Sequence, residues 1–115
     1  MSLVGRPYTW GGTSPDPGFD CSGFVYFFYG QFGVTLGRDT FSQWENGRLI
    51  LRADLQPGDI VFFEDTYTDG MSHNGIYIGN GRFVHSVDED NGVKLSALAD
   101  DYWTPRYAGA RRMVG

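Results

Sequence analysis

The chain is poor in cysteine, basic residues and long apolar runs, and each shortage excludes a class of protein. Cys21 is the only cysteine among 115 residues, so an internal disulfide is excluded. No apolar run approaches the roughly 20 residues that a membrane-spanning helix requires. The net charge is −5, with nine Lys and Arg against 14 Asp and Glu. We therefore expect neither nucleic acid nor membrane insertion, because both call for basic or long apolar surfaces.

The length and the 41% hydrophobic content are sufficient for one domain with one core, which we expect to span residues 1–115. The first residues are too few to form a signal peptide. Two interpretations follow from this start. The chain is either a cytoplasmic protein or a domain excised from a longer protein whose export signal lies outside this sequence.

The predicted elements are two helices followed by a series of strands. A helix over residues 21–32 has Asp20 as a good N-cap and Gly33 as a good stop, and a shorter helix is expected over about 40–46. Residues 5–20 are predicted to be a loop. This order is typical of an α+β domain with an antiparallel sheet. The expected strands cover residues 60–63, 73–78, 82–87, 93–97 and 107–113.

The segment 79–81 predicts a tight hairpin that carries one histidine on each arm. A three-residue loop would pair Ile78 with Arg82 and place His73 and His85 on the same face. A two-residue turn would place them on opposite faces, because side chains alternate along a strand. We predict the three-residue register.

Cys21 lies where a glycine-containing loop meets the first predicted helix. Unsatisfied N–H groups and a partial positive charge at a helix N-terminus favour a thiolate over a thiol. Cys21 is therefore a candidate nucleophile, with His73 as general base and His85 as the residue that fixes the His73 tautomer. The Cys21 backbone N–H and the Tyr8 hydroxyl are candidate donors to an oxyanion.

Two other interpretations of the same residues stay open. In the first interpretation, Cys21 is an ordinary small buried hydrophobic residue, and both histidines are strand residues whose side chains hydrogen-bond to the backbone. In the second, Cys21, His73 and His85 are three zinc ligands with an open fourth position. Neither a Cys-x-x-Cys nor a His-Glu-x-x-His spacing supports the zinc interpretation, and we expect no cofactor.

Six segments, in order along nearly the whole chain, resemble the NlpC-type peptidases, which are papain-like cysteine hydrolases of bacterial cell walls. The resemblance implies a papain-like α+β fold in which the helix carrying the cysteine packs on an antiparallel sheet. It also implies hydrolysis of amide bonds in peptidoglycan stem peptides, commonly between γ-D-glutamyl and a diamino acid. The segments are Pro7-Tyr8-Thr9-Trp10-Gly11-Gly12, Phe19-Asp20-Cys21-Ser22-Gly23-Phe24 and His73-Asn74-Gly75-Ile76-Tyr77-Ile78-Gly79, with residues 55–63, 83–85 and 107–112.

The resemblance implies the same catalytic roles: Cys21 as nucleophile, His73 as base and His85 as the orienting third residue. In family members that need a free stem-peptide amine, the residues flanking the cysteine help to bind it. Asp20 has a competing structural role as the helix cap. The substrate-binding set implied here is Asp20, Ser22, Arg38, Thr40 and Trp10.

The chain departs from the family in lacking a helix before residue 7 and in having Asn74 where a small apolar residue is usual. We expect a monomer that acts on stem peptides outside the cell, in the wall or in the periplasm, with cytoplasmic muropeptide recycling as the alternative. The main rival function is a non-catalytic domain that binds wall peptides or packs within a larger surface or phage-tail protein. A third option is an enzyme that transfers the acyl group to an amine instead of water.

Overall fold

The structure is a computed structural model that describes residues 4–5, 7–9, 12–14, 18–45, 47–66, 70–88 and 91–113. The strands, the α-helices and the short 3-10 helices (η) follow one another along the chain. In chain order they are β1 (Thr13–Ser14), β2 (Gly18–Phe19), α1 (Cys21–Gly30), α2 (Thr40–Trp44), β3 (Arg48–Ile50), η1 (Arg52–Asp54), β4 (Ile60–Glu64), β5 (Met71–Gly79), β6 (Arg82–Ser86), β7 (Val93–Ala97), η2 (Thr104–Arg106) and β8 (Tyr107–Arg112).

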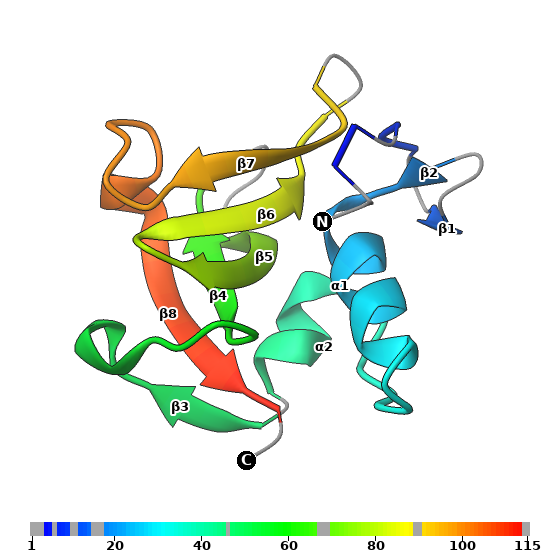
Figure 1. Ribbon diagram of the computed structural model, residues 1–115, viewed down its shortest axis with the longest axis horizontal. Coiled ribbons are helices and arrows are strands. Elements are labelled where there is room, and N and C mark those ends of the chain that lie inside the picture. Colours follow the sequence, from blue (N-terminus) through cyan, green and yellow to red (C-terminus); the bar gives the residue numbers. More distant parts are fainter. Residues whose placement is uncertain are drawn as a thin grey trace.

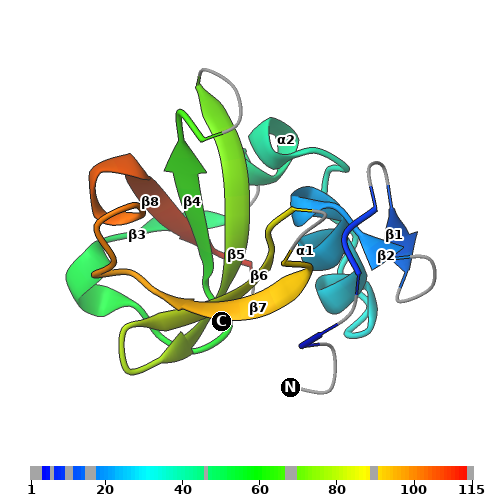
Figure 2. The same ribbon diagram turned by 90° about the horizontal axis from the view of Figure 1, so that it is seen from above.

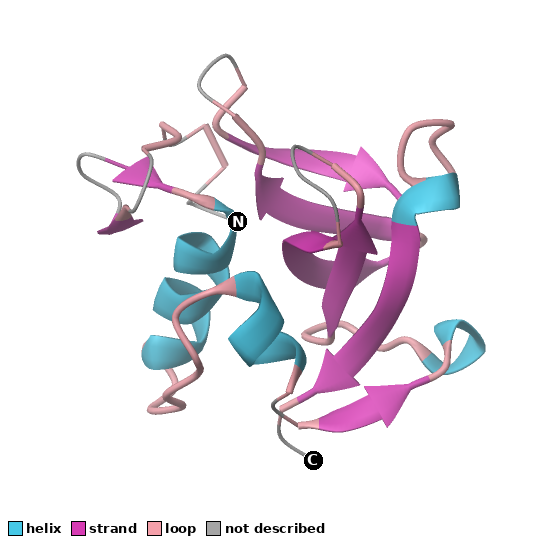
Figure 3. Ribbon diagram, turned by 180° about the vertical axis from the view of Figure 1, so that it is seen from behind, coloured by secondary structure: helices cyan, strands magenta, loops and turns pink. Residues whose placement is uncertain are grey.

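The molecule is a six-stranded antiparallel sheet with both α-helices on one side of it. The strand order is β3-β8-β4-β5-β6-β7. In Figure 1 and Figure 2 the helices and the small β1–β2 pair lie on the same side of the sheet. Helix α2 also meets β8, where Arg111 lies over the Trp44 ring. Figure 3 shows the same separation of helices from strands from behind. The predicted α+β class is confirmed.

The predicted helices and strands are present, and the differences lie at their ends and in the shortest strands. Helix α1 ends at Gly30, two residues earlier than expected, and Gly33 follows with φ of 77°, a conformation that glycine adopts without strain. The pair β1–β2 lies within residues 5–20, which were expected to be loop. These two-residue strands, like the three-residue β3, are too short to show an alternating sequence pattern.

Strand β4 is apolar at four consecutive positions because the sheet is covered on both faces. Ile60 and Phe62 belong to the cluster that includes the buried residues of α1. Val61 and Phe63 point the other way, into a second cluster with Trp103. A strand buried on both faces therefore appears as a continuous apolar run instead of an alternating one.

The turn between β5 and β6 differs from the predicted one. Gly79, and not Ile78, pairs with Arg82, because the register shifts between Tyr77 and Gly79. The turn itself consists of the two residues 80–81, with φ of 54° and 74°, the geometry that Asn-Gly sequences favour. The predicted pairing of Ile78 with Arg82 is wrong. The bulge at Ile78 adds the residue that a three-residue loop would have supplied.

The consequence for the histidines is as predicted, since the bulge compensates for the shorter turn. Beyond it, Ile76 pairs with Val84, and both belong to the cluster that α1 covers. His73 and His85 share the opposite face, where Nε2 of His73 lies 2.7 Å from Nδ1 of His85.

Candidate active site

Cys21 is the first residue of α1 and is held there by a capped helix start. Asp20 Oδ1 accepts a hydrogen bond from the backbone N–H of Gly23 at 2.6 Å, which satisfies one of the free donors of the first turn. Gly23 is required at this point, because a Cβ atom there would lie 1.9 Å from the carbonyl oxygen of Gly12. The cysteine is thus placed by a helix cap and by a close backbone contact with the preceding loop.

The Cys21 sulfur is buried between α2 and β5. It lies 3.8 Å from Oγ1 of Thr40 and 3.7 Å from the carbonyl oxygen of Ser72, so it reaches the residue immediately before His73. Cys21 as a whole is 5% exposed. In the described part of the chain, no hydrogen bond joins this sulfur to His73.

Burial raises the pKa of the Cys21 thiol, and the Asp20 carboxylate adds to this effect. Hydrogen bonds from Thr40 and from the backbone of Ser22 and Asn74 oppose it. Burial thus acts against the thiolate that we expect the helix N-terminus to favour. Removal of the sulfur from water outweighs the favourable N–H groups.

The two histidines form a buried hydrogen-bonded chain that ends on a third residue. Nε2 of His73 meets Nδ1 of His85 at 2.7 Å, and Nε2 of His85 meets Oγ of Ser96 at 2.8 Å. His73 is 3% exposed and His85 is fully buried. Ser96 lies on β7, opposite Phe83 of β6. No local feature of the sequence marks Ser96, and only the strand pairing identifies it.

An aromatic wall covers the histidine pair. The Trp103 indole stacks on the His73 ring with a centroid distance of 5.2 Å and an interplanar angle of 20°. The same indole meets His85 edge to face at 5.0 Å. The sequence does not point to Trp103, because it lies between the last two strands in a segment with no motif of its own.

Burial disfavours the charged form of both imidazoles. Burial lowers the pKa of His73 to about 3, although the Asp88 carboxylate acts in the opposite direction. Burial also lowers the pKa of His85, and repulsion from a protonated His73 and from Lys94 adds to the shift. Burial therefore disfavours the charged forms of both the Cys21 thiol and the His73 imidazole.

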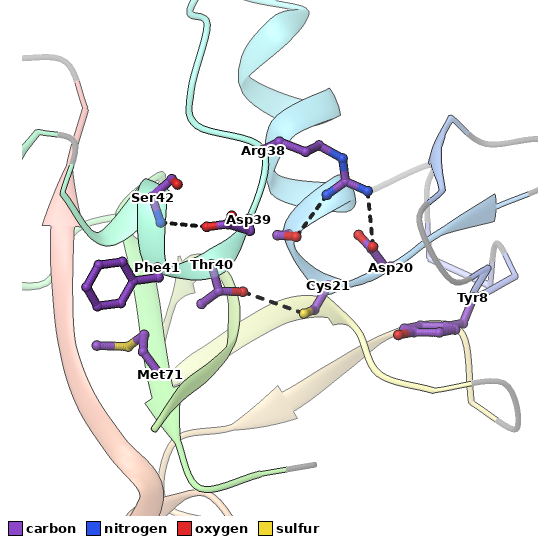
Figure 4. Close-up of a pocket in the computed structure, with 10 residues that line it drawn as sticks. Tyr8, Asp20, Cys21, Arg38, Asp39, Thr40, Phe41, Ser42 and Met71 are labelled. Atoms are coloured by element: carbon purple, nitrogen blue, oxygen red, sulfur yellow. Dashed lines mark hydrogen bonds and ion pairs between the residues drawn. The ribbon is translucent and has the colours of Figure 1, made fainter. Parts of the chain in front are cut away.

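Polar side chains on the open side of Cys21 form a second cluster. Arg38 donates from Nη2 to Oδ2 of Asp20 at 3.0 Å and from Nη1 to Oγ of Ser22 at 2.9 Å (Figure 4). Asp20 therefore serves both as helix cap and as a member of this cluster. The two roles that the sequence suggested for Asp20, helix cap and substrate-binding residue, are compatible. Oδ1 caps the helix, and Oδ2 accepts the hydrogen bond from Arg38.

The cluster borders a cavity of about 640 Å³. In Figure 4 the Tyr8 ring extends into it with its hydroxyl toward the Cys21 sulfur. Five of the predicted substrate or oxyanion residues line this space together with Cys21. Trp10 lies outside the described residues. The lining consists of Tyr8, Asp20, Cys21, Ser22, Arg38, Asp39, Thr40, Phe41, Ser42 and Met71.

A buried amide pair connects the cysteine side of the site to the histidine strand. Gln43 Nε2 donates to the carbonyl oxygens of Ser22 and Gly37, at 3.0 and 2.8 Å. Its Oε1 then accepts from Nδ2 of Asn74 at 2.6 Å. Asn74 stands at the position where the sequence resemblance leads us to expect a small apolar residue. It is therefore a polar link between α2, the start of α1 and β5.

The described residues give no support to the zinc interpretation. They contain no group of three or more His, Cys, Asp or Glu side chains arranged as metal ligands. Both nitrogens of His85 and one of His73 already take part in hydrogen bonds. Among the described helices, none has the length and apolar character needed to cross a membrane.

Comparison with known proteins finds similar sequences and the same fold in a set of longer proteins. Residues 5–112 match the profile of the NlpC/P60 family. The chain is 43% identical over 110 residues to the gamma-DL-glutamyl hydrolase of Bacillus subtilis, a match that covers 95% of this chain and 26% of the relative. It is 40% identical over 113 residues to the gamma-D-glutamyl-L-lysine dipeptidyl-peptidase of Bacillus cereus, a match that covers 97% of this chain and 34% of the relative.

A solved structure agrees with these matches. The crystal structure of an NlpC/P60 family protein from Bacillus cereus superposes with a TM-score of 0.90 at 39% identity, covering 97% of this chain and 37% of that one. The chain thus spans about a quarter to just over a third of these longer proteins.

Proposed function

Because the chain belongs to the NlpC/P60 family, we propose that it is a cysteine peptidase that hydrolyses amide bonds in peptidoglycan stem peptides. The observation that carries the proposal is the hydrogen-bonded chain His73–His85–Ser96 beside a cysteine whose sulfur contacts Ser72. The arrangement is that of a nucleophile, a base and residues that orient the base.

The reaction begins with transfer of the Cys21 proton to Nδ1 of His73. For Nδ1 to accept, Nε2 of His73 must carry a hydrogen and donate it to Nδ1 of His85, which in turn donates from its own Nε2 to Ser96. The chain of contacts is consistent with this assignment at each step. His85 and Ser96 therefore fix the tautomer of the base.

The sulfur then attacks the carbonyl carbon of the scissile amide, and the oxyanion takes hydrogen bonds from the Cys21 backbone N–H and the Tyr8 hydroxyl. Collapse of this intermediate breaks the C–N bond, and the imidazolium of His73 gives its proton to the leaving amine. A thioester remains on Cys21. Water, with His73 again as base, hydrolyses this thioester to the free acid and restores the thiol.

The substrate portion that stays on the sulfur occupies the 640 Å³ cavity. We assign recognition of a free stem-peptide amine there to Asp20, Ser22 and Thr40, with Arg38 holding the first two in place. The bond cleaved is then the one between γ-D-glutamyl and a diamino acid. This agrees with the name of the Bacillus cereus relative, a gamma-D-glutamyl-L-lysine dipeptidyl-peptidase.

The proposal extends to the setting of the protein. Residues 1–115 act as one catalytic domain, as a monomer, on wall peptides outside the cytoplasm. The rival function is a non-catalytic domain that binds wall peptides. An intact Cys21, His73 and His85 set argues against it, because selection does not maintain catalytic groups in a pure binding domain.

The test is mass spectrometry of purified peptidoglycan fragments after incubation with the wild type and with Cys21→Ala. We expect new stem-peptide products from the wild type only, with masses that identify the bond. If an amine acceptor is added to the reaction and becomes bonded to the product, the enzyme transfers the acyl group to amines as well as to water. Absence of products from a folded wild type that still binds the fragments would favour the binding domain.

A further inference from the structure

The Thr40 hydroxyl reaches the Cys21 sulfur from the start of α2. Its Oγ1 lies 3.8 Å from the sulfur (Figure 4), and the Thr40 side chain is buried. The carbonyl oxygen of Ser72, on β5, lies 3.7 Å from the same sulfur. The sulfur therefore contacts one oxygen that can only accept a hydrogen bond and one that can also donate.

These two oxygens favour different protonation states of Cys21. The carbonyl of Ser72 has no hydrogen, so the S–H group donates to it and leaves the sulfur lone pairs to the hydroxyl of Thr40. Once the proton has moved to His73, the carbonyl oxygen faces a negative sulfur and has nothing to donate. The Thr40 hydroxyl then donates to an ion, and such a hydrogen bond is roughly twice as strong as one between neutral groups.

Thr40 is held against the sulfur by Gln43, which follows it by three residues in α2. The Gln43 amide is buried and donates to the carbonyl oxygens of Ser22 and Gly37, at 3.0 and 2.8 Å. Its Oε1 accepts from Nδ2 of Asn74 at 2.6 Å. Residues three apart lie on the same side of a helix. These bonds therefore attach the side of α2 that carries Thr40 to the start of α1 and to β5.

The donors around the sulfur come from three different elements. Burial raises the pKa of the Cys21 thiol, and the hydrogen bonds from Thr40 and from the backbone of Ser22 and Asn74 lower it. Thr40 is the member of this set that uses a side chain, so its contribution can be removed by substitution. The Asp20 carboxylate raises the same pKa. The other titratable or charged side chains near the sulfur are Tyr8, Arg38 and Asp39, which line the same cavity, and His73, which follows Ser72 on β5.

We propose that Thr40 is a catalytic residue, whose hydroxyl donates a hydrogen bond to the Cys21 thiolate as His73 takes the proton. This inference rests on the proposed peptidase function and adds to it, because the role given to Thr40 above is in binding the substrate amine. The two roles are compatible, since a hydroxyl group donates one hydrogen, here to the sulfur, and accepts through two lone pairs. An ammonium group bound to Oγ1 would polarise the O–H bond and strengthen its donation to the sulfur.

The test measures the acidity of the thiol without substrate, so that amine binding plays no part. Cys21 is the only cysteine, and the ultraviolet absorbance of its thiolate is obtained as the difference from Cys21→Ala. Thr40→Val replaces the hydroxyl by a methyl group of similar size. We expect the midpoint of the titration to rise by about one pH unit, and alkylation by iodoacetamide at pH 7 to slow by roughly tenfold, the size of a hydrogen bond to a charged group.

Two further variants separate the hydroxyl from other effects of substitution. Thr40→Ser keeps the hydroxyl and should restore the wild-type midpoint and alkylation rate. Thr35→Val changes an exposed threonine that precedes α2 and does not line the cavity, and it should leave both measurements unchanged. If the thermal unfolding midpoint shows that Thr40→Val does not fold, Thr40→Ala removes the same hydroxyl and gives the same comparison.

A titration midpoint that is the same in Thr40→Val and the wild type would overturn the catalytic role and leave the peptidase function standing. Slower alkylation with an unchanged midpoint would also overturn it, because the substitution would then have altered access to the sulfur and not its acidity. Support requires a raised midpoint and a kcat/KM for stem peptides that falls at least as much as the alkylation rate and recovers in Thr40→Ser. Failure of the wild type to cleave peptidoglycan fragments would overturn the proposed function, and the catalytic role with it, whatever the titration shows.

Discussion

The two halves of the candidate site are built in different ways. The cysteine half is local: Asp20, Cys21 and Ser22 are consecutive, and Arg38, which joins the first and third of them, is half exposed. The histidine half is dispersed over β5, β6, β7 and the segment before β8, and it is buried under Trp103. One half therefore borders an open cavity with polar side chains, whereas the other is dry and holds the base in one orientation.

The largest expected effect comes from replacing each histidine of the buried half in turn. We expect His73→Ala to lower kcat/KM by about 10³-fold, within the usual range for a general base. We expect His85→Ala to lower it by about 10²-fold, because His85 acts only through the tautomer of His73. Steady-state kinetics with a stem-peptide substrate measures both. Equal losses, or a larger loss for His85→Ala, would contradict the assignment of roles.

The buried half should also make the fold sensitive to acid. Because the pKa of His73 is about 3 in the folded protein and near 6.5 in an unfolded chain, only the unfolded state takes up this proton as the pH falls below 6.5. The free energy of unfolding should therefore decrease on acidification, by about 1.6 kcal/mol between pH 6.5 and pH 5 from His73 alone.

Urea unfolding at several pH values measures this loss, and His85, whose pKa is also lowered, adds to it. His73→Gln serves as the control, since it removes one of the two groups and should flatten the profile. A wild-type stability that is constant over this range would show that the imidazoles are accessible to protons in the folded state.

The cysteine half should tolerate the loss of Arg38 with little effect on the free energy of unfolding. Arg38→Met breaks the contacts to Asp20 and Ser22, so we expect kcat/KM for free-amine substrates to fall by about tenfold. The free energy of unfolding should change by less than about 1 kcal/mol, because the Arg38 side chain is 40% exposed and such ion pairs are weak.

Arg112→Met is the matched control, because Arg112 pairs with the buried Asp59 far from Cys21, at 2.8 Å. It should lower the unfolding midpoint more than Arg38→Met does and should retain kcat/KM at a temperature where the fold is intact. The reverse pattern would mean that Arg38 supports the fold and not the substrate.

The smallest expected effect concerns the thiol itself. Burial raises the pKa of Cys21, so the fraction of thiolate at pH 8 should be lower than for a free cysteine. Alkylation by iodoacetamide, followed by mass spectrometry from pH 6 to pH 10, should still be accelerating above pH 8. A plateau at lower pH would indicate a preformed thiolate–imidazolium pair and restore the expectation from the helix N-terminus.

Much of the fold is readable from sequence because it rests on local chemistry. The cap by Asp20 and the glycine after α1 place the first helix, and strand β7 has the predicted bounds of 93–97. The hairpin shows the limit of this reasoning. The shared face of His73 and His85 was predicted from a three-residue loop, yet it arises from a two-residue turn and a bulge at Ile78. Loop length alone does not fix register when a bulge can add a residue.

The site shows the same limit. The contacts of Arg38 with Asp20 and Ser22 involve residues that the sequence already proposed, although it could not show that one carboxylate both caps the helix and binds the guanidinium. Ser96 and Trp103 were missed, since their positions beside the histidines depend on strand pairing and on a chain segment that returns from the far edge of the sheet. No pattern within a few residues records such long-range contacts.

By itself, then, the sequence determined the α+β class, the helix that presents Cys21, and the identity of the candidate nucleophile and histidines. Helix caps, turns and apolar periodicity involve residues only a few positions apart, so they can be predicted from the sequence. Only the tertiary structure decided that the histidine chain ends on Ser96, that Trp103 stacks on His73, and that burial raises the pKa of the thiol. These properties depend on burial and on packing across the sheet, and desolvation is set by everything that surrounds a group and not by its neighbours in the chain.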